Sequence, residues 1–222
     1  MPKKNKRDQY FNKLKIQRPR VDFFVEGKVT ESKYLTDLKN FLVREIYPDN
    51  ENKRRTILGQ IDIPRPGSDQ DCEKLTDRAI EETKDKNEHD KVFVVIDEDD
   101  RTTNAHKTKL QNAIKKAKEH GIHFIYSIPN IEFWALLHFV YCPTEISKDD
   151  CPCKLKKYLL NYEKELDFSK MQNNISIAIE NAKKIRKEHC IIDNKEIDLN
   201  NPTTNAFIIL EELKDFIENF PD

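Results

Sequence analysis

The sequence predicts an α/β fold in which a parallel sheet is flanked by helices and followed by a mostly helical C-terminal extension. Short apolar runs alternate four times with segments of helical periodicity over residues 21–141. Such alternation is typical of parallel strands joined by right-handed crossovers, with helices on both faces. After Pro143 the strand signal stops, and helical segments are separated by polar breaks. We therefore expect a basic arm over residues 1–20, an α/β domain over 21–142 and a helical subdomain over 143–222.

The first half of the α/β domain begins with a strand over residues 21–25, because β-branched and aromatic residues suit a buried strand. A helix follows from Thr30, a candidate N-cap, since apolar residues then recur at helical spacing. Residues 48–55 are polar and highly charged, which predicts a loop. Residues 57–63 alternate weakly and indicate a second strand, which the breaker cluster at 64–67 ends.

The second half contains the strongest strand signal in the chain, the apolar run over residues 91–96, which leads directly into four acidic residues. A helix over 72–82 precedes this strand, and a helix over 105–119 follows it. A fourth strand is expected over 122–127, before a buried helix over 131–141. Further helices are expected in the C-terminal extension near residues 154–166, 173–188 and 203–219.

Composition and charge exclude several classes of protein. The 222 residues are 36% charged, and their longest apolar run is far shorter than the roughly 20 residues that span a bilayer. The formal net charge of -1 hides an asymmetry, because the arm over residues 1–20 carries +7 and the remainder -8. The arm is either a phosphate-binding segment or a solvated tail. The odd number of cysteines, five, suggests reduced thiols. We expect a cytoplasmic protein that does not contact a membrane.

Acidic and amide side chains follow three of the four expected strands. Glu26 follows the first strand, Asp97 and Asp99 follow the third, and Asn130 and Glu132 follow the fourth. The carboxyl ends of parallel strands form the ligand-binding edge of such a sheet. Converging carboxylates repel each other unless a cation lies between them, and oxygen ligands favour Mg²⁺ or Mn²⁺. The acidic run is otherwise a solvated turn.

Further residues near this edge suit the binding of a phosphodiester. Gly27 stands at a strand-to-helix turn, where a phosphate can approach the backbone, and Lys28 adds a positive charge. Lys107 and Lys109 begin a row of lysines on the helix after the acidic run, which is either a phosphate-backbone contact or a solvated face. Together with a metal-held water, these residues fit phosphodiester cleavage.

Four stretches resemble a known family, the RloB-like proteins of bacterial phage-defence and restriction loci, and through it the Toprim pattern of topoisomerases, primases and related nucleases. Residues 25–31 (VEGKVTE) are similar to its E-G-x-x-T-E opening, and residues 97–100 to its acidic strand end. Residues 127–139 (SIPNIEFWALLHF) resemble its most specific segment, and residues 201–204 (NPTT) its C-terminal N-P-S-T element.

The resemblance implies a Toprim-like fold and a metal-dependent endonuclease that cleaves DNA or RNA, tRNA included. It implies that Glu26 is a general base or metal ligand, that Asp97 and Asp99 hold the metal, and that Glu132 is a supporting acid. It also implies a role as a toxic effector in anti-phage defence and abortive infection, with a partner sensor ATPase. We also expect that the chain can form a homo-oligomer.

Three alternatives remain open. The same fold could be a non-catalytic module that binds nucleic acid or a partner protein, or the acidic edge could act on a nucleotide rather than a polymer. A third alternative is a tetrahedral zinc site made by His138, Cys142, Cys151 and Cys153, although His138 also suits a packing role in its apolar stretch.

Overall fold

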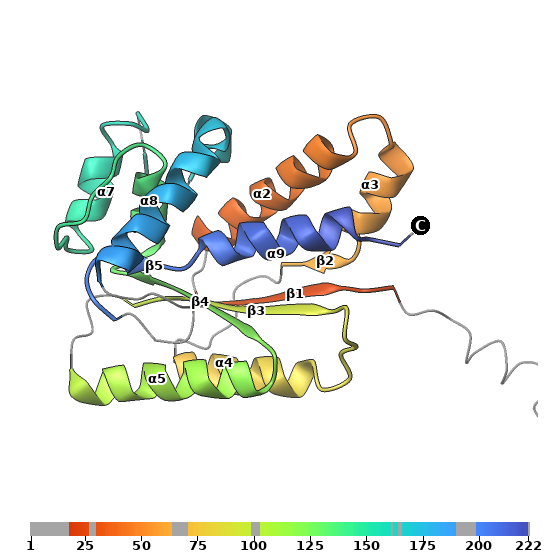
Figure 1. Cartoon of the computed structure of the whole chain (residues 1–222), viewed down its shortest axis with the longest axis horizontal. Coiled ribbons are helices and arrows are strands. Elements are labelled where there is room, and N and C mark those ends of the chain that lie inside the picture. The colour runs from red at the N-terminus through yellow and green to blue at the C-terminus, as the bar shows by residue number, and fades with distance from the viewer. Residues whose placement is uncertain are drawn as a thin grey trace, which may run out of the picture.

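The computed structural model describes residues 18–26, 30–63, 71–98, 103–160, 162–163, 166–189 and 199–221. A five-stranded sheet lies between two layers of helices (Figure 1). The order of its strands is β2-β1-β3-β4-β5. The strands are β1 (Val21–Val25), β2 (Ile61–Asp62), β3 (Lys91–Asp97), β4 (His123–Ile128) and β5 (Thr203–Thr204). Strands β1 to β4 run parallel and β5 runs antiparallel to β4. The predicted α/β class is confirmed.

The helices cover both faces of the sheet, as expected. In Figure 1, α4 and α5 lie on one side, and α2, α8 and α9 lie on the other. The α-helices are α2 (Thr30–Ile46), α3 (Glu51–Leu58), α4 (Cys72–Glu82), α5 (Asn104–Glu119), α6 (Ile131–Leu137), α7 (Asp150–Leu155), α8 (Ile175–Glu188) and α9 (Phe207–Glu218). Two short 3-10 helices, η1 (Phe168–Lys170) and η2 (Gln172–Asn174), precede α8.

The alternation of side chains along the central strand β3 divides the core in two. Val94 and Ile96 belong to a smaller core cluster with the apolar residues of α4 and α5. Phe93 and Val95 belong to a larger cluster with α2, α6, α8 and α9. Because successive strand residues point to opposite faces, the direction of Asp97, the last residue of β3, follows from its position in this alternation.

The segment predicted as a loop over residues 48–55 is wrong, because helix α3 begins at Glu51. The side chain of Asn50 caps this helix by accepting a hydrogen bond from the backbone N–H of Lys53 at 2.9 Å. Arg55 pairs with Glu51 one turn earlier, at 2.6 Å. A helix that buries little more than Ile57 has the composition of a loop, which explains the error.

Four other predicted elements change their bounds or type. Of the strand expected over residues 57–63, the structure keeps Ile61–Asp62, because α3 continues to Leu58 and a turn follows it. The helix expected over 131–141 ends at Leu137. In the C-terminal part, α7 and a turn occupy much of the region expected to be a helix near 154–166. The helix expected over 203–219 starts at Phe207, after the two residues of β5.

The C-terminal part packs into the same core as the α/β part. The larger cluster contains residues from β1 through to Phe220, and β5 extends the sheet beside β4. Residues on both sides of the predicted boundary at residue 143 therefore share one core. Most of the predicted arm, residues 1–17, lies outside the described residues, whereas Arg20 pairs with Asp22 at 3.1 Å. None of the helices in the described ranges combines the length and apolar character that crossing a bilayer requires.

Candidate functional site

Glu26 and Asp97 lie at the same edge of the sheet, at the carboxyl ends of neighbouring strands. Val25 is the register partner of Val95, and the backbone N–H of Glu26 donates to the carbonyl of Val95 at 3.0 Å. Glu26 therefore extends the β1–β3 ladder to a position one residue short of Asp97. Both residues are half-buried. The sequence placed these two carboxylates correctly on the sheet.

The two described residues of the acidic run, Asp97 and Glu98, lie on opposite faces of the sheet. Asp97 is two residues after Val95 in the same strand, so its side chain points to the same face of the sheet, which the larger core cluster covers. Glu98 lies on the opposite face, where its Oε1 is 2.8 Å from Nε2 of His106 on α5. Glu98 is 6% exposed, so it is a buried partner of α5 and lies on the other face of the sheet from Asp97. Asp99 lies outside the described residues, and its predicted position beside Asp97 stays a prediction.

Asp97, Ser127 and Thr204 form a row across three strands. Ser127 is the register partner of Asp97 on β4, and Thr204 is the partner of Ser127 on β5. The hydroxyls of Ser127 and Thr204 are 2.8 Å apart, and both side chains are buried. Two of the sequence motifs, whose paired hydroxyls are 77 residues apart in the chain, therefore meet beside the candidate catalytic aspartate.

Glu132 lies in the first turn of α6 and is held by a residue that the sequence did not indicate. The hydroxyl of Tyr162 donates to Oε1 of Glu132 at 2.9 Å. Burial raises the pKa of the Tyr162 phenol, and the carboxylates of Glu132, Glu31 and Asp97 raise this pKa further. Tyr162 therefore contacts Glu132 of α6 directly, and the negative charges of Glu31 on α2 and Asp97 on β3 also act on its hydroxyl.

Glu31 and Tyr162 are the functional candidates that sequence analysis left out of the site. Glu31 belongs to the first turn of α2 and is 6% exposed, an unusually low exposure for a glutamate. Its place at the end of the VEGKVTE motif was the signal that could have found it. Tyr162 has no such signal, because it stands 30 residues after its partner Glu132, in a segment without regular structure.

Asn130 immediately precedes α6 and offers an acceptor at the same end of the sheet. Its side chain is buried, and its Nδ2 donates to the carbonyl of Lys148 at 3.2 Å. Its Oδ1 is also buried and has no hydrogen-bond partner among the described residues. An unsatisfied buried acceptor is costly, so a ligand or a water that donates to this oxygen would stabilise the site.

The predicted phosphate-binding residues are placed only in part. Gly27 and Lys28 lie outside the described residues. Lys107 and Lys109 are both exposed in the first two turns of α5, the helix that follows the acidic run. Nζ of Lys109 is 3.4 Å from Oδ2 of Asp71, which is the N-cap of α4. The structure thus pairs Lys109 with a neighbouring helix, and it does not test a role for either lysine in substrate binding.

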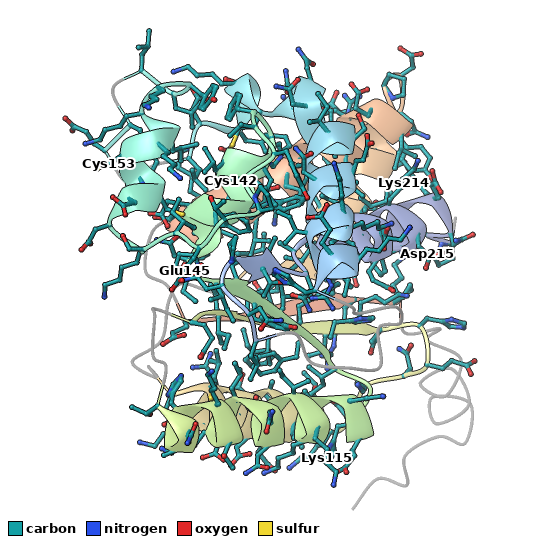
Figure 2. The ribbon with its side chains drawn as sticks, turned by 60° about the vertical axis from the view of Figure 1, so that its left-hand side comes forward. Lys115, Cys142, Glu145, Cys153, Lys214 and Asp215 are labelled. Carbon is teal, nitrogen blue, oxygen red and sulfur yellow. The ribbon has the colours of Figure 1, made fainter. Side chains whose placement is uncertain are left out.

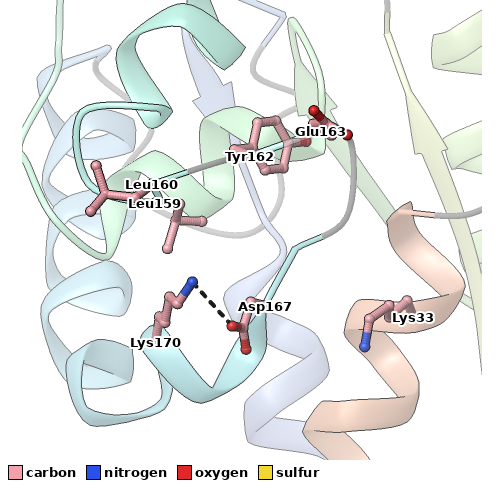
Figure 3. Close-up of a pocket in the computed structure, with 7 residues that line it drawn as sticks. All are labelled: Lys33, Leu159, Leu160, Tyr162, Glu163, Asp167 and Lys170. Atoms are coloured by element: carbon pink, nitrogen blue, oxygen red, sulfur yellow. Dashed lines mark ion pairs between the residues drawn. The ribbon is translucent and has the colours of Figure 1, made fainter.

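A pocket of about 580 Å³ lies next to Tyr162 (Figure 3). Figure 3 shows that Lys33 of α2 lines the pocket and that Lys170 is paired with Asp167. The Lys170–Asp167 distance is 3.3 Å. Lys33 is in turn 2.9 Å from Asp37. Because both lysines have carboxylate partners, the pocket is balanced in charge and is not a strong anion site.

The donor set at the sheet edge suits a hard cation, since Glu26, Asp97 and Glu132 all present oxygen. Within the described ranges, however, no three His, Cys, Asp or Glu side chains are grouped closely enough to hold a metal ion. The predicted set of Glu26, Asp97 and Asp99 includes a residue beyond those ranges. The metal site therefore stays a prediction, because one of its three expected ligands, Asp99, lies outside the described residues.

The zinc alternative is wrong. His138, Cys142, Cys151 and Cys153 are all described, yet they form no metal-binding group. Cys153 is exposed, and Figure 2 shows it on the outer helix α7. The Nδ1 of His138 donates to the carbonyl of Trp134 at 3.1 Å, and burial lowers the pKa of the ring to about 4. His138 is a neutral packing histidine.

Comparison with known proteins identifies the family. The sequence model of the family described as RloB-like protein matches residues 23–213. The chain belongs to the RloB-like family. This match covers the sheet apart from the first two residues of β1, together with the acidic edge and the segment that carries Tyr162 in this RloB-like chain. No curated protein and no solved structure matches the chain.

Proposed function

We propose that this RloB-like chain is a Toprim-like, metal-dependent endonuclease that cleaves DNA or RNA, tRNA included, as an effector of bacterial anti-phage defence. The observation that supports this proposal is the position of Glu26 and Asp97 at the carboxyl ends of neighbouring parallel strands, with Glu132 held by Tyr162 at the start of α6. This edge is where open α/β sheets bind their ligands.

Electrostatics favour a cation at this edge. Two carboxylates about 4 Å apart in an effective dielectric of about 20 repel each other by about 4 kcal/mol. Each further carboxylate adds to this repulsion, and after burial, which is the largest cause, the charges of Glu132, Glu31 and Asp97 also raise the pKa of Tyr162. A bound divalent cation is the arrangement that keeps such groups both ionised and close together.

Each residue has a distinct part in the proposed reaction. Mg²⁺ or Mn²⁺, when bound, would offset the negative charge on the phosphate and lower the pKa of a water molecule. Glu26, Asp97 and Asp99 would hold the cation, with Glu26 also able to accept a proton from the attacking water. Glu132 would orient this water as a supporting acid, and Oδ1 of Asn130 would accept a hydrogen bond from the substrate.

The test is cleavage of mixed DNA and tRNA by the purified chain with Mg²⁺ or Mn²⁺. Glu26→Gln and Asp97→Asn should each abolish cleavage, whereas Asp77→Asn should not, because Asp77 lies on α4 and pairs with Lys116. Without metal, the Asp97→Asn protein should melt at or above the temperature of the parent, since a repulsive charge has been removed. Cleavage by the Glu26→Gln, Asp97→Asn double variant at the parent's rate would refute the proposal.

The defence role has its own test, inducible expression of the parent and of Glu26→Gln in bacteria. The parent should be toxic, and sequencing of cellular DNA and RNA ends should reveal breaks that are missing from the variant. Breaks confined to tRNA would assign the substrate to RNA, and breaks across the genome would assign it to DNA. Equal toxicity of both proteins would contradict an effector role that depends on catalysis.

A non-catalytic module is the second candidate, because the described residues contain no group of three side chains able to hold a metal ion. In that case the same edge would bind nucleic acid or a partner protein, such as a sensor ATPase. Binding of nucleic acid without any product, with metal and candidate partners present, favours this second function over the first.

A further inference from the structure

Tyr162 reaches the acidic edge from outside the sheet. It stands in the segment between α7 and η1, and its side chain is 4% exposed. Its hydroxyl donates to Oε1 of Glu132 at 2.9 Å, while its ring forms part of the pocket wall in Figure 3. A phenol buried among carboxylates keeps its proton throughout the physiological range, because its pKa is raised. Tyr162 therefore acts as a hydrogen-bond donor.

The partner carboxylate needs such a donor. Glu132 is half-buried in the first turn of α6, and its side chain has three rotatable torsions. A hydrogen bond to a charged group is worth about 1.5–3 kcal/mol, which is enough to select one orientation over the others. The donor itself is fixed by burial, so the orientation of Glu132 is set by a rigid neighbour rather than by solvent.

We propose that Tyr162 is a positioning residue that fixes the carboxylate of Glu132 at the acidic edge. The proposal rests on the proposed nuclease function, in which Glu132 orients the attacking water. Residues that orient a catalytic group without touching the substrate typically contribute 10- to 100-fold to activity. Tyr162 accordingly affects the turnover rate and leaves the binding of substrate largely unchanged.

The experiment removes the hydroxyl alone. Tyr162→Phe is compared with Tyr158→Phe, a control from the same segment whose ring is 43% exposed and stacks on Phe139 at 5.1 Å. Both changes are made in the parent and in Glu132→Gln, and kcat, KM and melting temperature are measured for each protein. Tyr162→Phe should lower kcat by about 10- to 100-fold with KM little changed. In the Glu132→Gln background the same change should have little further effect, because Tyr162 acts through Glu132.

Two results overturn the proposal while leaving the nuclease function standing. The first is a parent that cleaves and a folded Tyr162→Phe protein with the kcat of Tyr158→Phe. The second is an equal loss of kcat in both backgrounds, which would show that Tyr162 acts independently of Glu132. A parent that cleaves no substrate overturns the proposed function itself, and with it the role of Tyr162.

Discussion

The indole Nε1 of Trp134 donates a hydrogen bond to the hydroxyl of Tyr34 at 2.7 Å, and both side chains are buried. This contact joins α6, which carries Glu132, to α2, which carries Glu31. The relative position of the two acidic residues therefore depends on a hydrogen bond in the core, whose partners lie one turn or less further along each helix.

Tyr34→Phe should destabilise the protein by about 1–3 kcal/mol, because the N–H of Trp134 loses its acceptor and stays buried. Urea unfolding followed by circular dichroism measures this change. Tyr158→Phe is the control and should change the free energy of unfolding by less than about 0.5 kcal/mol, since Tyr158 is exposed. Equal stabilities for the two variants would show that the contact does not contribute to folding.

The side chain of Asn205 forms hydrogen bonds with the backbone of β4, so its substitution should also destabilise the protein. Its Nδ2 donates to the carbonyl of Phe124 and its Oδ1 accepts from the N–H of Tyr126, both at 2.8 Å. Asn205→Ala should cost about 2–4 kcal/mol, because two buried backbone groups lose their partners. Asn205→Asp should not restore stability, since a carboxylate cannot donate to Phe124. Asn173→Ala, at an exposed asparagine, is the control, and chemical denaturation that finds it as harmful would contradict this account.

His138 should make stability depend on pH. Its folded-state pKa is lowered from 6.5 to about 4 by burial, so the unfolded chain takes up the proton more readily. The contribution is fully present above pH 6.5 and is lost as the pH falls toward 4, by up to about 3 kcal/mol.

Urea unfolding at pH 7.5, 6 and 5 checks this window. His138→Gln should lower stability at every pH but should weaken the decline between pH 6.5 and 5. A parent and variant with parallel pH profiles would show that another group causes the decline.

Lys107 lies in the first turn of α5, the helix that follows the acidic run in the chain. If it contacts a phosphate, Lys107→Ala should weaken binding of nucleic acid and reduce the slope of log K against log salt by about 1. Lys115 is the control, because it lies about 12 Å further along the helix and points away from the sheet in Figure 2. Filter binding at several salt concentrations gives both slopes, and equal slopes would place Lys107 outside the interface.

The parts of the fold that follow from local patterns were predictable. The helix over residues 72–82 and the strand beginning at Lys91 agree with the structure, since periodicity and apolar character coincide there. Helix α3 was missed because a polar helix held by a cap and an ion pair resembles a loop in composition. Strand β5 was missed because two residues carry no periodic signal, and their strand character comes from pairing with β4.

The same distinction applies to the site. The position of Glu26 and Asp97 at one edge of the sheet was predictable, because the end of a strand is visible in the sequence and parallel pairing then brings such ends together. Tyr162 could not be found, because its contact with Glu132 depends on how the chain returns after α7. The contact between Glu98 and His106 could not be predicted either, because it depends on which helix covers which face of the sheet.

Calorimetric titration of the purified chain with Mn²⁺ is the most direct test of the claim that the acidic edge holds a divalent cation. The parent should bind the ion, Asp97→Asn should lose at least 10-fold in affinity, and Asp77→Asn should match the parent. Equal affinities for the parent and Asp97→Asn, or no binding by the parent at all, would contradict the claim.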